Sequence, residues 1–248
     1  MIDLKSISED SINGVDIKLL QPLKGPRVNV DTVLLAGFSK VRRGERICEL
    51  GCAHGAVSLI LAKRKEVSVV GLDIQENLVH MAEKNRELNE LSDRVSFIHG
   101  DLREIHKILP PQGFDVVVAN PPYGDPTRHR TGNRSENVLA KHGVVCSVED
   151  VAEACRYLLG DKGRAYFVFA AERLVDLLCA LRYRGVEPKA LRAVHPREGK
   201  DASVFLVKAL RSASPGIRLL PPLRINDDGG SYTEDLLEFY SPEGSPCP

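Results

Sequence analysis

The residues best suited to chemistry in this chain are Asn120-Pro121-Pro122-Tyr123, which follow the apolar run at 114–119. A short run of β-branched and apolar residues predicts a strand that is buried on both faces, as in parallel α/β sheets. The four residues therefore stand at the carboxyl end of a central strand. Open α/β sheets bind their ligands at that edge.

These residue types suit the activation of a flat amine. Each proline fixes its own φ and keeps the preceding residue extended, so the turn is stiff. The side-chain carbonyl of Asn120 and a proline backbone carbonyl are then two fixed acceptors for an amine with two hydrogens, such as the exocyclic amine of adenine, cytosine or guanine or the amide of glutamine. Tyr123 would stack on the flat group, and catalysis would depend on positioning and fixed dipoles. The alternative is that the four residues are only a rigid turn after a strand.

A second candidate site is the loop Glu49-Leu50-Gly51-Cys52-Ala53-His54-Gly55, which joins the first predicted strand to the first predicted helix. Its small residues let the backbone approach a ligand closely, and the helix amino terminus favours groups that accept hydrogen bonds. Asp73 ends the second predicted strand and Asp101 follows the third. Either aspartate alone could be only a helix cap. Together with Asn120, these strand ends predict one ligand pocket.

Strands and helices alternate along most of the chain, which predicts a parallel sheet covered by helices on both faces. A short link at 196–200 joins two further predicted strands, and so short a link requires an antiparallel hairpin. We therefore predict an α/β fold with a seven-stranded sheet, mostly parallel, that ends in a carboxyl-terminal antiparallel hairpin. The predicted strands lie at 46–50, 67–73, 95–99, 114–119, 164–169, 189–195 and 202–208, and the predicted helices at 55–64, 77–89, 147–159 and 172–184.

Three regions follow from this pattern. Residues 1–45 form an amino-terminal extension that we expect to pack on the core, with a strand at 15–22 and a helix capped by Asp31. Residues 46–211 form the main domain. Residues 212–248 form a tail rich in Pro, Gly and acid, which we expect to be loosely attached or disordered.

The overall composition excludes few classes of function. Lys and Arg total 34, as do Asp and Glu, so any contact with nucleic acid must come from a local patch. The six cysteines lack a paired metal-ligand spacing, so we predict reduced thiols and no metal site. The first residues lack a secretory pattern and no run approaches membrane-spanning length, so we expect a cytoplasmic protein without membrane contact.

From about Arg46 to Leu210 the chain resembles the class I methyltransferases, which use S-adenosylmethionine. The first loop is similar to their acidic-x-Gly-x-Gly-x-Gly loop, with Ala53 in place of the middle glycine. The resemblance implies a Rossmann-like fold, S-adenosylmethionine as methyl donor, S-adenosylhomocysteine as product and no metal. It also implies a set of cofactor-binding residues: Glu49, Gly51, Cys52, Ala53, His54 and Gly55 around the methionine half, Asp73 and Ile74 at the ribose, Asp101 and Leu102 at the adenine, and Asn120.

His54 lies in the cofactor loop but is not needed as a base. The attacked amine can lose its proton to water after transfer, so we expect the His54 side chain to face solvent.

The tetrapeptide also occurs in enzymes that methylate adenine in DNA, guanine in rRNA, glutamine in release factors and adenine in tRNA. The segments 20–27 and 31–36 are similar to the opening of the tRNA adenine-N6-methyltransferase family that modifies the adenine beside the anticodon of a valine tRNA. His195-Pro196-Arg197 and the segment 220–234 are similar to that family too. The resemblance implies a tRNA substrate, with Asn120, Pro121, Pro122 and Tyr123 as the catalytic residues.

Basic residues near the predicted site support an RNA substrate. Arg and Lys side chains could hold phosphates while an unpaired base enters the pocket. The candidates are Arg27, Arg128, Arg130, Arg134, Arg197 and Lys200. The alternative for each is an ordinary solvated charge. Two other functions stay open: methylation of a protein glutamine or a small-molecule amine on the same core, and a non-enzymatic nucleotide-binding module.

Overall fold

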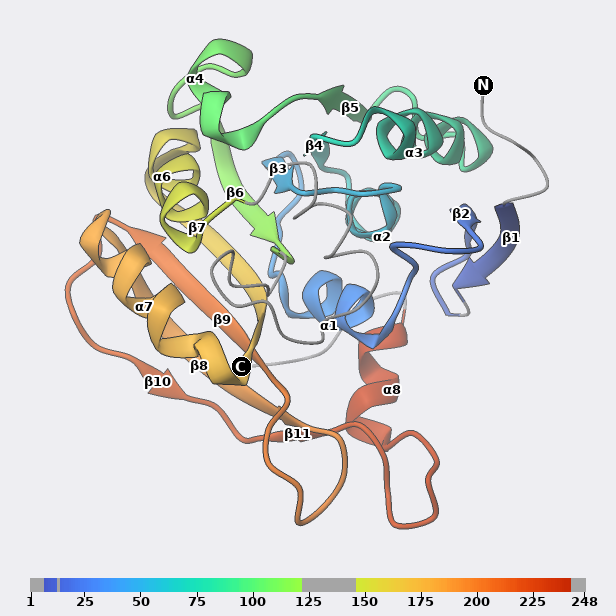
Figure 1. Ribbon diagram of the computed structural model, residues 1–248, viewed down its shortest axis with the longest axis vertical. Helices are drawn as coiled ribbons and strands as arrows, with labels where there is room; N and C mark the ends of the chain where they lie inside the picture. The colour runs from blue at the N-terminus through green and yellow to red at the C-terminus, as the bar shows by residue number, and fades with distance from the viewer. Residues whose placement is uncertain (1–6, 13, 122–145, 242–248) are drawn as a thin grey trace.

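The computed structural model describes residues 7–12, 14–121 and 146–241 (Figure 1). One large sheet runs through the molecule. Its seven long strands, in order across the sheet, are β5 (Val95–His99), β4 (Ser68–Asp73), β3 (Arg46–Leu50), β6 (Phe114–Ala119), β7 (Leu159–Ala170), β9 (Val204–Arg211) and β8 (Val186–His195). The first five are mutually parallel, and β9 is antiparallel to both β7 and β8. The predicted fold class is confirmed.

Over the residues that the structure describes, the sheet has nine strands rather than the predicted seven. Two short strands from the tail, β10 (Arg218–Leu219) and β11 (Leu223–Arg224), each pair with the outer edge of β8. Runs of two residues have no pattern of their own, so sequence periodicity could not reveal them.

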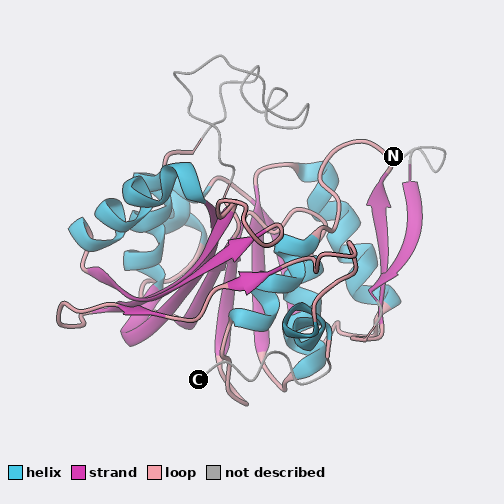
Figure 2. Ribbon diagram, turned by 90° about the horizontal axis from the view of Figure 1, so that it is seen from below, coloured by secondary structure: helices cyan, strands magenta, loops and turns pink. Residues whose placement is uncertain are grey.

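Helices cover both faces of the sheet, as Figure 2 shows. One layer contains α1 (Val30–Phe38), α2 (Ala56–Arg64) and α3 (Glu76–Leu88), and the other contains α4 (Ile105–Ile108), α6 (Val148–Leu158) and α7 (Leu174–Tyr183). Alternate residues of each strand enter opposite cores: Ile47 joins the α1 side and Cys48 the α6 side. Both cores consist of closely packed, buried apolar side chains, so the strand ends between them are held rigidly. Among the described helices, none has the length and apolar content needed to cross a bilayer.

The amino-terminal extension contains a hairpin of β1 (Ile7–Ile12) and β2 (Ile17–Pro22). Asn85, which is fully buried in α3, fixes the hairpin: its Oδ1 accepts from Leu20 N at 2.6 Å and its Nδ2 donates to Leu20 O at 2.9 Å. The predicted strand at 15–22 is present, but sequence reasoning missed its partner. Asp31 is not the helix cap; Asn29 caps α1 in a reciprocal pair with Thr32.

The tail is not loosely attached over the residues that the structure describes. Its helix α8 (Glu234–Tyr240) packs against α1, and Phe239 is fully buried beside Gly37. Arg64 Nη2 donates to Phe239 O at 2.5 Å, and the Arg192 guanidinium lies 5.6 Å from the Phe239 ring centroid. The expectation of a loose tail was wrong, because composition did not reveal that Leu223, Leu236 and Phe239 are fully buried.

Candidate functional site

A pocket opens at the carboxyl ends of the central strands. It is lined by five of the residues predicted to bind the cofactor and by one predicted catalytic residue: Gly51, Asp73, Ile74, Asp101 and Leu102, and Pro121. These residues lie at or just after the carboxyl ends of β3, β4, β5 and β6, so the parallel topology brings them together. Apolar walls come from Leu50, Leu72 and Val151.

The loop after β3 is shaped for close approach of a ligand. Gly51 has φ +74°, and a Cβ built there would meet no protein atom within 4 Å, so its Cα faces open space in the pocket wall. Gly55 has φ +88° for a different reason, because a Cβ there would lie 2.5 Å from the Phe97 ring. Ala53 also has a left-handed backbone, with φ +47°. Ala53, which replaces the usual glycine, therefore adopts the backbone conformation that the loop needs, at a cost in strain because it carries a Cβ.

Asp73 is the polar centre of the pocket. Its Oδ2 accepts from Ala53 N at 2.8 Å and its Oδ1 from Gln75 N at 2.9 Å, which leaves further acceptor capacity on both oxygens. Burial raises the pKa of Asp73, while the two backbone donors oppose that shift. A pair of vicinal hydroxyls, as in a ribose, matches this acceptor arrangement.

Glu49 lies behind the pocket rather than in its lining. It is 4% exposed, and its Oε2 accepts from Ser58 N at 2.8 Å and from Ser58 Oγ. Burial raises the pKa of Glu49 to about 8, against the lowering effect of the Ser58 donors and with a small addition from Asp73. Glu49 therefore ties β3 to the first turn of α2. Cys52 is also buried and belongs to the core.

Asp101 lies at the mouth of the pocket. It caps the short 3-10 helix η2 (Leu102–Glu104) by accepting from Arg103 N at 2.9 Å, and it forms an ion pair with Arg103 Nη2 at 2.5 Å. The hydrogen bonds from Arg103 lower the pKa of Asp101, so it stays ionised. Its capping role does not exclude ligand contact, because the residue also lines the pocket.

His54 does not face solvent, so that expectation was wrong. Its side chain is 4% exposed and neither ring nitrogen has a hydrogen-bond partner in the described chain. Asn85 of α3 joins this loop to the amino-terminal extension, because its Nδ2 donates to His54 O and to Leu20 O, each at 2.9 Å. Burial lowers the pKa of His54 to about 4, with a further contribution from Arg27.

Asn120 and Pro121 come directly after β6. Ala119 of β6 pairs with Leu50 of β3, so Asn120 and Gly51 leave neighbouring strands at the same level. Adjacent strands lie roughly 4.8 Å apart, which puts the start of the tetrapeptide beside the cofactor loop. Asn120 is half-buried and Pro121 is buried in the pocket wall. The predicted residues Pro122 and Tyr123 lie outside the described residues.

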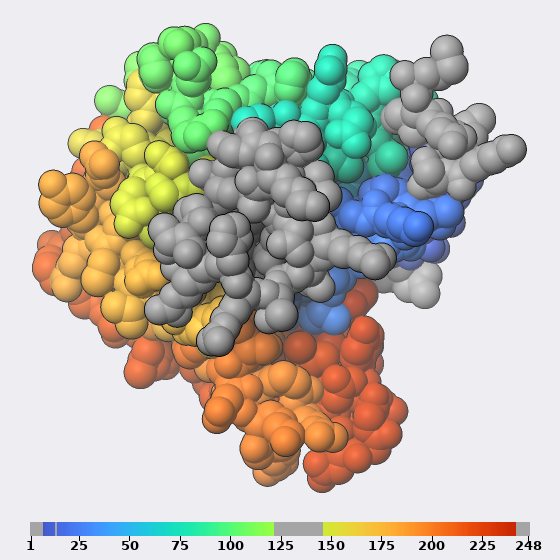
Figure 3. Space-filling model, in the orientation of Figure 1, coloured from blue at the N-terminus to red at the C-terminus, as the bar shows by residue number. Residues whose placement is uncertain are grey.

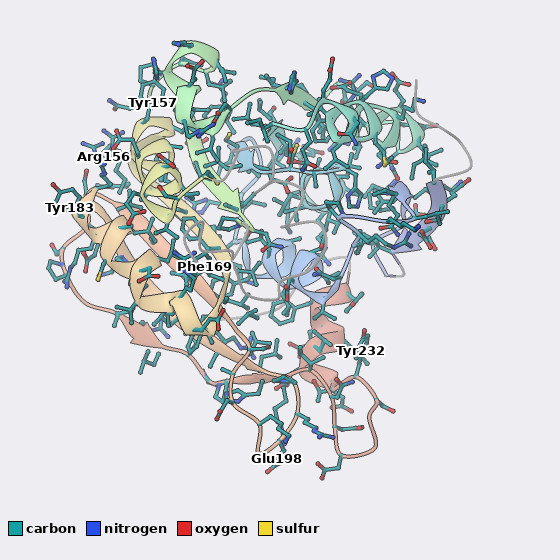
Figure 4. All side chains as sticks on the ribbon, viewed as in Figure 1. Arg156, Tyr157, Phe169, Tyr183, Glu198 and Tyr232 are labelled. Atoms are coloured by element: carbon teal, nitrogen blue, oxygen red, sulfur yellow. The ribbon has the colours of Figure 1, made fainter. Side chains whose placement is uncertain are left out.

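The predicted substrate-binding residues are scattered. Arg27 is held within the amino-terminal segment by Asp10 at 3.1 Å, Ser8 and Pro22 O. Arg197 and Lys200 are exposed on the link between β8 and β9, which lies at the pocket edge of the sheet because Val204 pairs with Ala170. Figure 3 shows this link projecting beside the tail, and Glu198, labelled in Figure 4, pairs there with Arg224 at 2.5 Å. Arg128, Arg130 and Arg134 lie outside the described residues.

Several site residues escaped sequence reasoning. Gln75 and Arg103 line the pocket, and each lies two residues after a predicted aspartate. Their nearness to those strand ends in the sequence could have indicated them. Cys146, just before α6, and Val151, in its first turns, also line the pocket; this placement depends on how the helix packs, which no local sequence pattern indicates. In the part of the chain that is described, no group of three His, Cys, Asp or Glu side chains could hold a metal ion.

Comparison with known proteins identifies the family. A model of the methyltransferase domain matches residues 42–169, which is more than half of the chain. The chain belongs to this methyltransferase family. It is an S-adenosylmethionine-dependent methyltransferase, and the match spans the loop after β3, Asp73, Asp101 and Asn120.

Relatives are similar along most of their length. A tRNA1(Val) (adenine(37)-N6)-methyltransferase from Aliivibrio salmonicida is 26% identical over 218 residues, covering 88% of this chain and 90% of the relative. An enzyme of the same name from Actinobacillus pleuropneumoniae is 30% identical over 156 residues, covering 60% of this chain and 63% of the relative.

Solved structures show the same fold. A predicted O-methyltransferase from Agrobacterium tumefaciens superimposes with a TM-score of 0.70 at 21% identity, covering 87% of this chain and 97% of its own. A geranyl diphosphate methyltransferase solved with sinefungin gives a TM-score of 0.54 at 12% identity, covering 73% and 77%. At these identities the likeness concerns the fold alone.

The residues of this chain fit the cofactor of the family. The open Cα of Gly51 leaves room for a ligand against the loop backbone. Asp73 offers acceptors for two hydroxyls, and Leu102 and Ile74 offer apolar contact to a flat ring. When bound, S-adenosylmethionine supplies a methyl group already activated by its sulfonium.

Proposed function

We propose that this methyltransferase acts on the exocyclic N6 amine of an adenine in tRNA, next to the anticodon. The observation that carries the proposal is the position of Asn120 and Pro121, which leave β6 beside the cofactor loop. The relatives at 26% and 30% identity bear the name of an adenine-N6 enzyme acting on tRNA. An acceptor pair at this position fits an amine with two hydrogens.

The role of the chain is to orient the amine. The Asn120 side-chain carbonyl and the Pro121 backbone carbonyl accept one hydrogen bond each from the amine, which turns its lone pair out of conjugation with the ring. Fixed acceptors need no reorganisation during the reaction, so they stabilise the charge that develops on nitrogen. The extra proton then leaves to water. No side chain forms a covalent bond.

The test is to supply labelled cofactor with either bulk tRNA or total protein. We expect label in tRNA with the unaltered protein, and a loss of at least about a hundredfold in the Asn120→Ala variant. Asn77→Ala, on the exposed side of α3, is the matched control and should transfer at the normal rate. Label in protein and not in tRNA would favour a glutamine or other protein amine and would overturn the proposal.

A further inference from the structure

A second pocket lies away from the cofactor site, on the α1 face of the sheet. It is enclosed by the end of α1, by β7, β9 and β8, and by β10 of the tail, and its volume is about 500 Å³. That volume falls in the range of small-molecule sites. Nothing in the proposed methyl transfer uses it.

Four cationic side chains line this pocket and no acidic one does. They are Lys40, Lys189, Lys208 and Arg218, and they come from four different segments of the chain. The whole chain is electrically balanced, with 34 basic and 34 acidic residues. The excess of positive charge is therefore local, and like charges gathered on one surface repel one another unless an anion is present.

Two of these cations lack a partner in the described structure. The side chains of Lys208 and Arg218 make no hydrogen bond or ion pair with any described residue. Lys189 Nζ donates to Ser214 O at 3.0 Å. The nearby acid Glu45 is already paired with Arg164 at 2.6 Å. Burial lowers the pKa of Lys208, and the charges of Arg164, Arg42 and Arg218 lower it further.

The floor and rim of the pocket are apolar. Phe38 and Tyr166 pack edge to face beneath it, with ring centroids 5.9 Å apart and an interplanar angle of 88°. Ile217, which is 44% exposed, forms part of the rim. This pocket suits a ligand that has a negatively charged group, which the cationic side chains would contact, and a flat or apolar group, which Phe38, Tyr166 and Ile217 would contact.

We propose that this pocket binds the phosphate group of a nucleotide unit. RNA backbone phosphate and free nucleotide share that chemistry, and RNA as the source rests on the proposed function. The distance is suitable for RNA. Lys208 on β9 lies two strands from β6, which is roughly 10 Å across the sheet. It pairs with Tyr166, and Tyr166 pairs with Val118, so Lys208 lies at the level of a residue two positions before Asn120. A strand of RNA with one base at Asn120 would have neighbouring phosphates within reach.

The RNA arm of the test compares two double variants by fluorescence anisotropy with a labelled anticodon stem-loop. K189Q/K208Q removes two pocket charges, and K65Q/K107Q removes two lysine charges elsewhere on the surface. We expect K189Q/K208Q to weaken binding by roughly five- to tenfold and to reduce the salt slope by about 1.4, at about 0.7 per phosphate contact. K65Q/K107Q should stay within about twofold. R218Q, at an exposed position on β10, should weaken binding in the same direction.

The nucleotide arm uses uridine 5′-monophosphate and uridine, with saturating S-adenosylhomocysteine to fill the cofactor pocket. Suppose that the unaltered protein binds the monophosphate, and that K189Q/K208Q loses this binding but keeps normal affinity for RNA. This result supports the phosphate site and identifies a free nucleotide as its source. Equal affinities of the two double variants for both RNA and monophosphate would overturn the inference. If the unaltered protein does not transfer labelled methyl groups to tRNA, the proposed function is wrong. The nucleotide arm still tests whether the second pocket binds phosphate.

Discussion

The buried carboxyl of Glu49 predicts a stability that depends on pH. Burial raises its pKa in the folded protein to about 8 from an ordinary value of 4.5. A raised pKa means that the folded state binds the proton more tightly than the unfolded state does. Its contribution to stability is therefore complete below pH 4.5 and is lost as the pH rises through 8.

The size of the effect follows from these two values. Each unit of pKa difference corresponds to about 1.36 kcal/mol, so the full effect is on the order of 5 kcal/mol, and most of it is lost between pH 5 and pH 8. Glu49→Gln removes the ionisation but keeps an oxygen that can accept from Ser58 N and Ser58 Oγ. Between pH 5 and pH 8 we therefore expect the free energy of unfolding to fall by about 3 to 4 kcal/mol less in the variant than in the unaltered protein.

The assay is urea unfolding of the cofactor-free protein at pH 5 and pH 8. Glu172→Gln, which alters an exposed carboxyl, is the control and should change neither value by more than about 0.5 kcal/mol. If Glu49→Gln and the unaltered protein lose stability in parallel as the pH rises, then Glu49 does not hold its proton through neutral pH and the reasoning from burial is wrong.

Three further predictions concern the loop, the tail and the site. Ala53→Gly relieves a left-handed residue, so we expect the free energy of unfolding in urea to rise by about 0.5 to 1 kcal/mol, and a fall would contradict the strain. Gly37→Ala would place a Cβ 2.6 Å from Phe239 Cδ1, so we expect a loss of about 1 to 3 kcal/mol in the same assay, whereas a gain would mean that α8 is not held there. By calorimetry, Asp73→Ala should weaken S-adenosylhomocysteine binding about tenfold or more. Asn120→Ala should keep that affinity within about threefold while turnover falls about a hundredfold, and equal effects of the two changes would refute their separate roles.

Elements with a strong local pattern were predictable from the sequence. The apolar runs that form β5 and β6 have the predicted bounds, and Ser147 caps α6 in a reciprocal pair with Asp150 as its spacing indicates. In each case the signal lies within a few residues of the element. Asp73 and Asp101 were found for the same reason, since both lie at strand ends.

Features that depend on distant parts of the chain were not predictable. His54 is buried in a loop that Asn85 joins to β2, and Asn85 lies 65 residues from Leu20 along the chain. The tail is fixed by Phe239 entering the space that Gly37 leaves open. Local periodicity reports which face of an element is apolar, but it does not report which distant segment covers that face.

The central claim is that Asn120 and Pro121 present the N6 amine of an RNA adenine to a methyl donor held against the loop after β3. The most direct measurement is mass spectrometry of nucleosides from tRNA incubated with the protein and S-adenosylmethionine carrying a deuterated methyl group. The account predicts labelled N6-methyladenosine, formed about a hundredfold more slowly with Asn120→Ala. Label confined to another nucleoside, or to another atom of adenosine, would contradict it.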